Sequence, residues 1–146
     1  MQNSNESFDI EVTAQYLKDL SFENPNSPMS LIQKDAPKIG LDVNVNIQKF
    51  EENNYEVVLN VTATATNHSD ETIFIVSVAY AGIFDLSTIP EEFHRNVLVI
   101  YCPTLLFPFV RAIVSDATRD GGFPPLMLKP IDFTKLYQQD NEQSIN

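Results

Sequence analysis

Apolar and polar residues alternate through most of the first half of the chain, a pattern that predicts β-strands in an antiparallel sheet with one polar face. The pattern predicts strands at 8–16, 39–48, 55–65 and 72–80. In the first of them we expect one face to carry Phe8, Ile10, Val12, Ala14 and Tyr16.

Turn-forming residues separate these segments. Asparagine-rich turns at 51–54 and 67–70 predict two hairpins, because asparagine tolerates the left-handed conformations that tight turns need. After the first strand, prolines and asparagines predict an extended crossover loop from Asp19 to about Pro37.

The predicted strand 72–80 is apolar on both faces, unlike the other strands. A strand that is covered on one side only does not show this pattern. Either a second layer covers its outer face, or that face binds another molecule. Because contiguous apolar patches are rarely left bare, we favour a subunit or partner contact. We expect residues 81–86 to leave the sheet.

A helical spacing of apolar residues follows. Thr88 predicts an N-cap, with Glu91 completing a capping box. The spacing continues to about residue 117, although Pro103 and Pro108 lie inside it. Each interior proline removes a backbone donor and costs ~3 kcal/mol. The pattern therefore predicts either two helices that meet near Cys102 or one bent helix.

The end of the chain has clear boundary signals. Gly121 and Gly122 end the long helix, because glycine adopts the positive φ found past a helix end. The segment 123–130 predicts an extended apolar loop, and Asp132 predicts the cap of a short helix.

Strands first and helices afterwards indicate an α+β fold. We expect a single domain at 8–137 between a disordered polar tail at 1–7 and a mobile polar tail at 138–146.

Composition narrows the class of partner. The chain has 146 residues, 43% of them hydrophobic, and a formal net charge of −11. Such a charge argues against nucleic acid and against an anionic bilayer surface. It either suits basic partners or serves solubility alone. We also expect no signal peptide, no apolar run of about 18 residues and no membrane insertion. With a lone cysteine, these features predict a cytoplasmic protein.

Catalytic chemistry is not expected. The candidate groups are Cys102, His68 and His94, and helical geometry separates His94 from Cys102 by ~12 Å along the axis. This set offers neither a nucleophile with its base nor a zinc site, and the scattered glycines form no phosphate loop. We predict no enzyme activity and no cofactor. What remains is apolar surface, on the outer face of the fourth strand and in the loops at 25–37 and 123–130. The loops either close over the sheet or, as we favour, line grooves in an oligomer.

A set of segments spread over about residues 8–137 matches a known family in order and spacing. The segments are 19–28, 33–35, 55–59, 61–62, 82–84, 101–103, 106–108, 122–126 and 130–133. The most specific are the Cys-Pro and Leu-Phe-Pro segments of the long helix and the Gly-Phe-Pro segment after it. With these segments the chain resembles the SecB family of bacterial export chaperones.

The resemblance implies a four-stranded antiparallel sheet with the helices on one face and a homotetramer built as a dimer of dimers. It implies that Pro103 and Pro108 bend the long helix at a subunit interface. Family members bind unfolded preproteins in apolar grooves and pass them to the ATPase SecA, which recognises an acidic face of the sheet. The alternative within this class is a SecB-like chaperone dedicated to one client, such as an antitoxin.

The resemblance also implies site residues. SecA-contact positions fall on Asp19, Glu23, Ile75 and Ser77, and Ser77 departs from the acidic residue common there. Ala36 and Ile32 stand where the family often has aromatic residues, so we expect this groove to depend more on aliphatic contacts. The implied groove residues are Ile32, Phe74, Ile83, Phe84, Phe107, Leu126 and Phe133.

Overall fold

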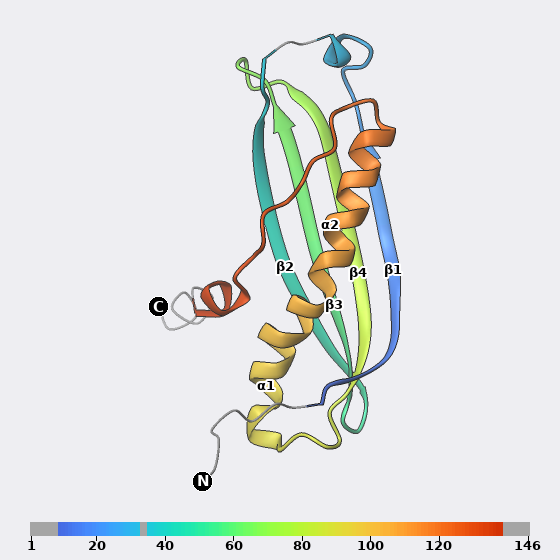
Figure 1. Cartoon of the computed structure of the whole chain (residues 1–146), viewed down its shortest axis with the longest axis vertical. Helices are drawn as coiled ribbons and strands as arrows, with labels where there is room; N and C mark the ends of the chain where they lie inside the picture. The colour runs from blue at the N-terminus through green and yellow to red at the C-terminus, as the bar shows by residue number, and fades with distance from the viewer. Residues whose placement is uncertain (1–8, 33–34, 139–146) are drawn as a thin grey trace.

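A computed structural model describes residues 9–32 and 35–138, in which a four-stranded antiparallel sheet carries all the helices on one face (Figure 1). We call this face the inner face and the opposite one the outer face. The sheet order is β1-β4-β3-β2. The strands β2, β3 and β4, which are joined by hairpins, therefore lie side by side, and β1 is the edge strand next to β4. The strands are β1 (Glu11–Glu23), β2 (Lys38–Glu51), β3 (Asn54–Thr66) and β4 (Thr72–Asp85).

The expected architecture is confirmed, with an α+β order of elements and antiparallel pairing throughout the sheet. The predicted tail 1–7, Phe8 and residues 33–34 lie outside the described residues, as does the predicted tail from residue 139 onward.

The first strand is longer than predicted, and its faces are not those expected. It continues through Asp19 to Glu23, whereas a loop was expected from Asp19 onward. Register shifts between Val12 and Ala14 and between Leu17 and Asp19 each insert one residue. Because an inserted residue reverses the alternation, Ala14 and Tyr16 do not share a face with Val12.

The fourth strand also extends further than predicted, through residues 81–85. Within this extension Gly82 leaves room for the Phe84 ring and Leu106, because a Cβ there would lie 2.8 Å from the ring. On the outer face, Ile75 and Ser77 are only half-buried. In the described part of the chain no helix or strand covers that face, so of the two alternatives the second layer is absent there (Figure 1).

The helical region is one continuous helix, Glu91–Asp120, with a change of geometry in the middle. Its start differs from the prediction: Pro90 occupies the N-cap position, and no side chain caps the first turn. A π-helical turn precedes Pro103, which lies in the first turn of α2 where its missing N–H is tolerated. Its segments are η2 (Glu91–Phe93), α1 (His94–Asn96), η3 (Val97–Tyr101) and α2 (Cys102–Asp120).

The helix packs on the inner face and forms the core. Leu106, Val110 and Val114 recur every fourth residue and are fully buried, which is the helical spacing of one face. By length and composition this helix could cross a membrane, so the expectation that the chain has no such apolar run was wrong. The helices that form the cores of globular domains pass the same test.

After α2 the chain turns back across the inner face. Gly122 has φ 95°, as expected of glycine past a helix end, and an extended segment follows to residue 132. Residues 133–138 are helical, and Asp132 Oδ1 accepts the backbone N–H of Thr134 at 3.0 Å, so the predicted cap is confirmed. A short 3₁₀ turn, η1 (Met29–Leu31), lies in the crossover between β1 and β2.

Candidate functional site

An apolar pocket of about 530 Å³ lies at the end of the molecule where the crossover loop meets the segment after α2. Three parts of the chain that are distant in the sequence meet there: the crossover loop with the start of β2, the start of β4, and the loop that follows α2. The pocket is lined by Ser30, Asp35, Ala36, Pro37, Ile39, Ile73, Phe74, Phe123, Pro124, Pro125 and Leu126.

Three aromatic rings pack together beside this pocket. The Phe74 ring centroid lies 5.9 Å from that of Phe22 and 5.0 Å from that of Phe123. Offset and tilted ring pairs at these distances are favourable, so the rings support one another in fixed positions. The pocket therefore has a rigid aromatic wall formed by β4 and the loop after α2.

The chemistry of the lining suits apolar side chains. Pro37, Pro124 and Pro125 have no backbone N–H, so they offer apolar surface without a donor. Ala36 contributes only a methyl group to the lining. A site with few polar groups selects for apolar character more than for a particular sequence.

The predicted groove residues are only partly brought together. Phe74 and Leu126 line the pocket, while Ile32, within the crossover loop, is 64% exposed and lies outside the lining. Ile83 lies on the outer face, because it pairs with Ala14 and Glu56.

The remaining three predicted groove residues are core residues in this arrangement. Phe84 is 0% exposed, and the Phe107 and Phe133 rings pack edge to face, 6.5 Å apart, below the surface. They therefore present no surface to a ligand in a single chain. Conversely, Ile39, Ile73 and Phe123 line the pocket and were not predicted. The signals that could have found them are the inward alternation of Ile39 and the Gly-Phe-Pro segment that contains Phe123.

The predicted partner-contact residues lie together on the outer face. Glu23 pairs directly with Ile75 across β1 and β4, and Ser77 and Asp19 follow at neighbouring positions of the same two strands. Directly paired residues share a face, so the side chains of Asp19, Glu23, Ile75 and Ser77 form one patch. Asp19 and Glu23 are exposed, whereas Ser77 is half-buried and its hydroxyl lies 3.0 Å from that of Thr62.

A polar hollow of about 750 Å³ adjoins this patch on the side of β3 and β2. Asp19, Lys18 and Glu56 all line it. Glu56 accepts a hydrogen bond from the Tyr16 hydroxyl and pairs with Lys18 at 2.9 Å. The hydrogen bond from Tyr16, followed by the one from Lys18, lowers the pKa of Glu56, and burial together with Glu56 raises the pKa of Tyr16 to about 12.

The groups considered for catalysis are accounted for by burial or by structural contacts. Burial raises the pKa of the Cys102 thiol to about 12. His94 Nε2 lies 2.8 Å from the Ile89 carbonyl oxygen, and His68 lies 3.5 Å from Asp35 near the surface. Among residues 9–32 and 35–138, no cluster of histidine, cysteine and carboxylate side chains is arranged to hold a metal ion.

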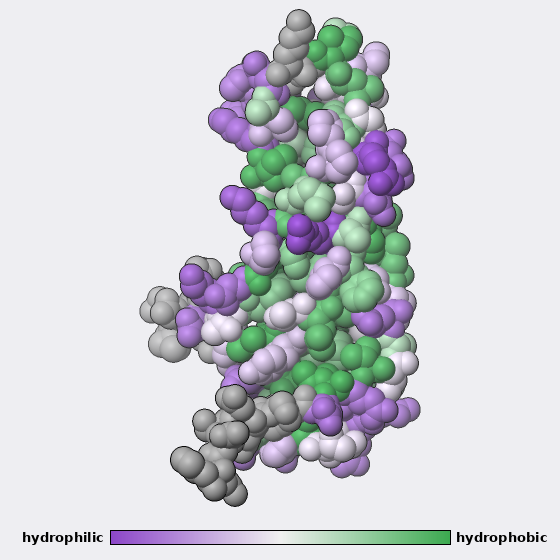
Figure 2. Space-filling model, viewed as in Figure 1, coloured by the Kyte–Doolittle hydropathy of each residue, from purple (hydrophilic) through white to green (hydrophobic). Residues whose placement is uncertain are grey.

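Apolar side chains are also exposed along the inner face, where Figure 2 shows hydrophobic surface interrupted by polar patches. Tyr101, Leu105 and Phe109 recur every fourth residue along the helix and are about half exposed. The Phe109 ring stacks on Tyr80, 5.4 Å away, and Tyr80 pairs with Leu17 of β1. The exposed stripe of the helix is therefore continuous with β1.

Comparisons with known proteins agree with these features. A family profile described as preprotein translocase subunit SecB matches residues 2–144. The protein-export protein SecB of Nitrobacter winogradskyi is 51% identical over 135 residues, which cover 92% of this chain and 84% of that protein. The protein of the same name from Bartonella bacilliformis is 47% identical over 140 residues, covering 95% and 87% respectively.

A solved structure extends the likeness to the fold. The SecB-like chaperone of Mycobacterium tuberculosis, in complex with a peptide from the HigA1 antitoxin, superposes with a TM-score of 0.68 at 16% identity. The match covers 84% of this chain and 91% of that one. With a family match over nearly the whole length and relatives at about half identity, the chain belongs to the SecB family of protein-export chaperones.

Proposed function

We propose that this protein is a holdase: it binds non-native secretory precursors through apolar side chains, keeps them unfolded and delivers them to the ATPase SecA. The observation that carries the proposal is the apolar pocket of about 530 Å³ with its proline-rich wall. A ligand held by apolar contacts alone need not have a defined sequence, which suits many different unfolded chains. No catalytic step is part of the proposal.

The outer-face patch supports the delivery step. Asp19 and Glu23 place two exposed carboxylates on one edge of the outer face, in a chain whose net charge is −11. Such a patch attracts a basic segment of a partner and raises its association rate. The apolar pocket lies on the inner face, so client and SecA need not compete for the same surface.

The assembly that we propose is a homotetramer in the cytoplasm. The exposed stripe of Tyr101, Leu105 and Phe109 and the exposed Leu17 and Leu20 of β1 support it. Exposed apolar residues in a continuous row are typical of a surface that a subunit covers.

The holdase proposal is tested by refolding an unfolded secretory precursor with and without the purified protein. We expect the protein at equimolar concentration to slow refolding and to suppress aggregation. Pro125→Glu, which places a charge in the pocket wall, should weaken precursor binding at least about tenfold. Pro130→Glu is the matched control, because Pro130 is exposed in the same loop but outside the lining. No effect of the wild-type protein on any precursor would refute the proposal.

The delivery step has its own test. Reversing both charges with Asp19→Lys and Glu23→Lys should weaken SecA binding, most strongly at low salt, and leave precursor binding unchanged. The control reverses Glu51 and Glu52, two exposed carboxylates at the end of β2 and in the turn that follows it. Equal losses of SecA binding in the two double variants would mean that only the net charge matters. That result would contradict a defined patch.

The second candidate function is that of a chaperone dedicated to a single client. Its only structural support is the antitoxin-bound relative, and at 16% identity that likeness concerns the fold alone. The refolding experiment separates the two, because a holdase for export binds several unrelated unfolded chains and a dedicated chaperone binds one.

A further inference from the structure

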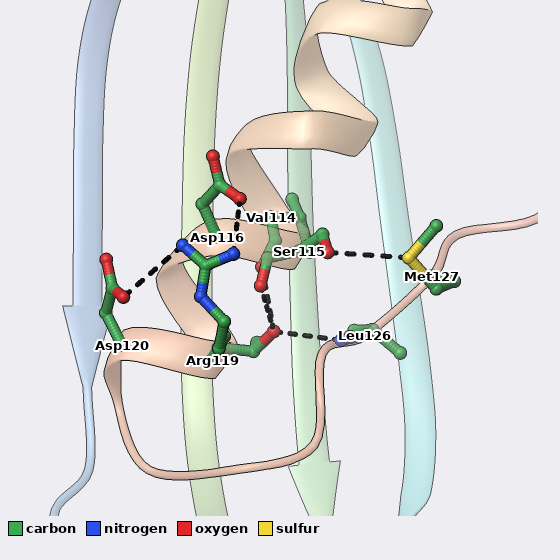
Figure 3. Close-up of polar contacts among 8 residues, drawn as sticks. Val114, Ser115, Asp116, Arg119, Asp120, Leu126 and Met127 are labelled. Atoms are coloured by element: carbon green, nitrogen blue, oxygen red, sulfur yellow. Dashed lines mark hydrogen bonds and ion pairs between the residues drawn. The ribbon is translucent and has the colours of Figure 1, made fainter.

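A buried hydroxyl lies in the last turns of α2. Thr118 is 0% exposed and belongs to the helix face that packs on the sheet. Its Oγ1 donates toward the Val114 carbonyl at 2.9 Å or the Ser115 carbonyl at 3.0 Å, and it accepts the backbone N–H of Leu126 at 2.9 Å. Figure 3 shows the amide of Leu126 directed at this turn of the helix.

The same residue binds the other end of the following loop. The Thr118 carbonyl oxygen accepts the backbone N–H of Phe123 at 3.1 Å. Pro124 and Pro125 have no N–H, so Phe123 and Leu126 supply the only backbone donors of the segment 123–126. Both donors therefore bind Thr118, one through its carbonyl and one through its hydroxyl.

This segment is one wall of the apolar pocket. All of its residues, from Phe123 to Leu126, line the pocket. Beyond it, the exposed Met127 receives a weak hydrogen bond at 3.4 Å from Ser115 Oγ to its sulfur, so the helix end also holds the residue after the wall (Figure 3). The position of the wall relative to β4 is thus set from the end of α2.

From this arrangement we infer that Thr118 is a positioning residue of the pocket: its hydroxyl holds the 123–126 wall in place and so sets the affinity for apolar client segments. The inference rests on the proposed holdase function. A buried hydroxyl is costly unless its hydrogen bonds are made, and here each bond has a partner. An apolar replacement of the same shape would leave the Leu126 N–H without its acceptor.

The test compares Thr118→Val, which keeps the shape but removes the acceptor, with Thr118→Ser, which keeps the acceptor. Thr118→Val should weaken binding of an unfolded precursor about threefold to tenfold. Thr118→Ser should stay within about twofold of the wild type. SecA binding should be unchanged in both variants, because Asp19 and Glu23 lie on the other face.

A second readout separates positioning from general stability. Amide hydrogen exchange at Leu126 should be faster in Thr118→Val than in Thr118→Ser, while the amides of β3 exchange alike in both. If Thr118→Val does not fold, hydrogen exchange is measured in the wild type alone. Its Leu126 amide should be protected in the free protein. Exchange of that amide at the unstructured rate in the wild type would overturn the inference.

These experiments distinguish a failure of the inference from a failure of the proposed function. If the wild type binds precursors and Thr118→Val binds them equally well, the inference is wrong and the proposed function stands. Equal losses in Thr118→Val and Thr118→Ser would also overturn it, because the hydroxyl would not be the cause. If the wild type binds no unfolded chain, the proposed function fails, and the inference fails with it.

Discussion

Tyr16, Lys18 and Glu56 form a polar cluster that spans the outer face of the sheet. Tyr16 belongs to β1 and Glu56 to β3, so their hydrogen bond passes over β4, which lies between them. The small Ala81, the direct partner of Tyr16 on β4, leaves room for this bridge. The cluster thus holds the edge strand that carries Asp19 and Glu23.

The cluster predicts a pH dependence of stability. Glu56→Gln should lower the free energy of unfolding by about 1 kcal/mol at pH 7. Because its folded pKa lies below the ordinary 4.5, the contribution of Glu56 is present above that value and is lost as the pH falls through the folded pKa. Urea unfolding of the wild type and the variant, repeated from pH 7 downward, measures this difference in the free energy of unfolding. Glu52→Gln, in the exposed turn, is the control, and a difference that does not shrink with acid would contradict the assignment.

Tyr16 predicts a loss of stability at high pH. Its pKa is raised from 10.0 to about 12, so its contribution is complete below pH 10.0 and declines as the pH approaches about 12. Tyr16→Phe should therefore destabilise the protein at pH 7 and lose its effect at high pH. Ultraviolet titration of the phenolate in the wild type checks the shift directly, and a tyrosine set that titrates entirely near pH 10.0 would exclude it.

Cys102 is a core residue, and its thiol should be unreactive. It is 0% exposed, and burial raises its pKa to about 12. Since the thiolate is the reactive form, iodoacetamide should alkylate the folded protein more than about a hundredfold more slowly than the unfolded protein at pH 8. Mass spectrometry of both states measures this, and similar rates would show that the thiol is accessible.

The end of α2 packs against β1 at one glycine. Gly121 has an ordinary φ of −75°, so its need for glycine is steric: a Cβ would lie 2.3 Å and 2.5 Å from carbons of the Phe22 ring. That ring is packed against Phe74 and Phe123, so it has little freedom to move aside. The helix end, β1 and the aromatic wall of the pocket are therefore one packed unit.

Gly121→Ala should be destabilising by about 1–3 kcal/mol, because the Phe22 ring must shift within a close-packed group. Gly40→Ala is the matched control: it lies in β2, and a Cβ there meets no atom closer than 3.9 Å. We expect that change to be neutral or stabilising, since glycine weakens a strand by ~0.5–1 kcal/mol. Thermal unfolding of both variants measures the contrast, and equal effects would contradict the packing argument.

The whole molecule leaves apolar surface exposed beside the long helix, on the side of β1. Phe109 and Phe50 are exposed to a similar degree, 45% and 50%, but Phe109 lies on the helix stripe and Phe50 near the β2–β3 turn. If a partner subunit covers the helix stripe, the assembly should depend on Phe109 and not on Phe50.

Phe109→Glu should dissociate the assembly into smaller species, because a charge would be buried between subunits. Light scattering after gel filtration measures the mass, with Phe50→Glu as the control of equal charge and similar exposure. A wild type that is monomeric at micromolar concentration, or a Phe109→Glu variant of unchanged mass, would contradict the proposed tetramer.

Local patterns predicted much of this fold. The alternation in 39–48 and 55–65 identified β2 and β3 and their inward residues, because both strands keep regular pairing through these segments. Asp132 was predicted as a cap from its type and place alone, and the motifs of the helix and of the following loop identified the family. These features depend on neighbours in the chain, which is why a sequence contains them.

The candidate site could be predicted only in part. The family resemblance named Phe74 as a groove residue, but no local pattern places it beside Phe22 and Phe123. Phe107 and Phe133 were expected in the groove, yet each buries the other. Which of several apolar residues lines a pocket depends on packing between distant segments, and composition does not encode it.

The chain by itself determined the α+β class, the order of elements, the acidic character and the family. Only the tertiary structure decided which face Ala14 and Tyr16 occupy. Strict alternation from Val12 would have placed both on the inner face, and the extra residue between Val12 and Ala14 moves them to the outer one. The second extra residue, between Leu17 and Asp19, restores the original alternation, so Asp19 and Glu23 lie on the outer face. The physical reason is that a bulge is a property of the pairing with β4: the residue in excess is defined only when the partner strand is in place.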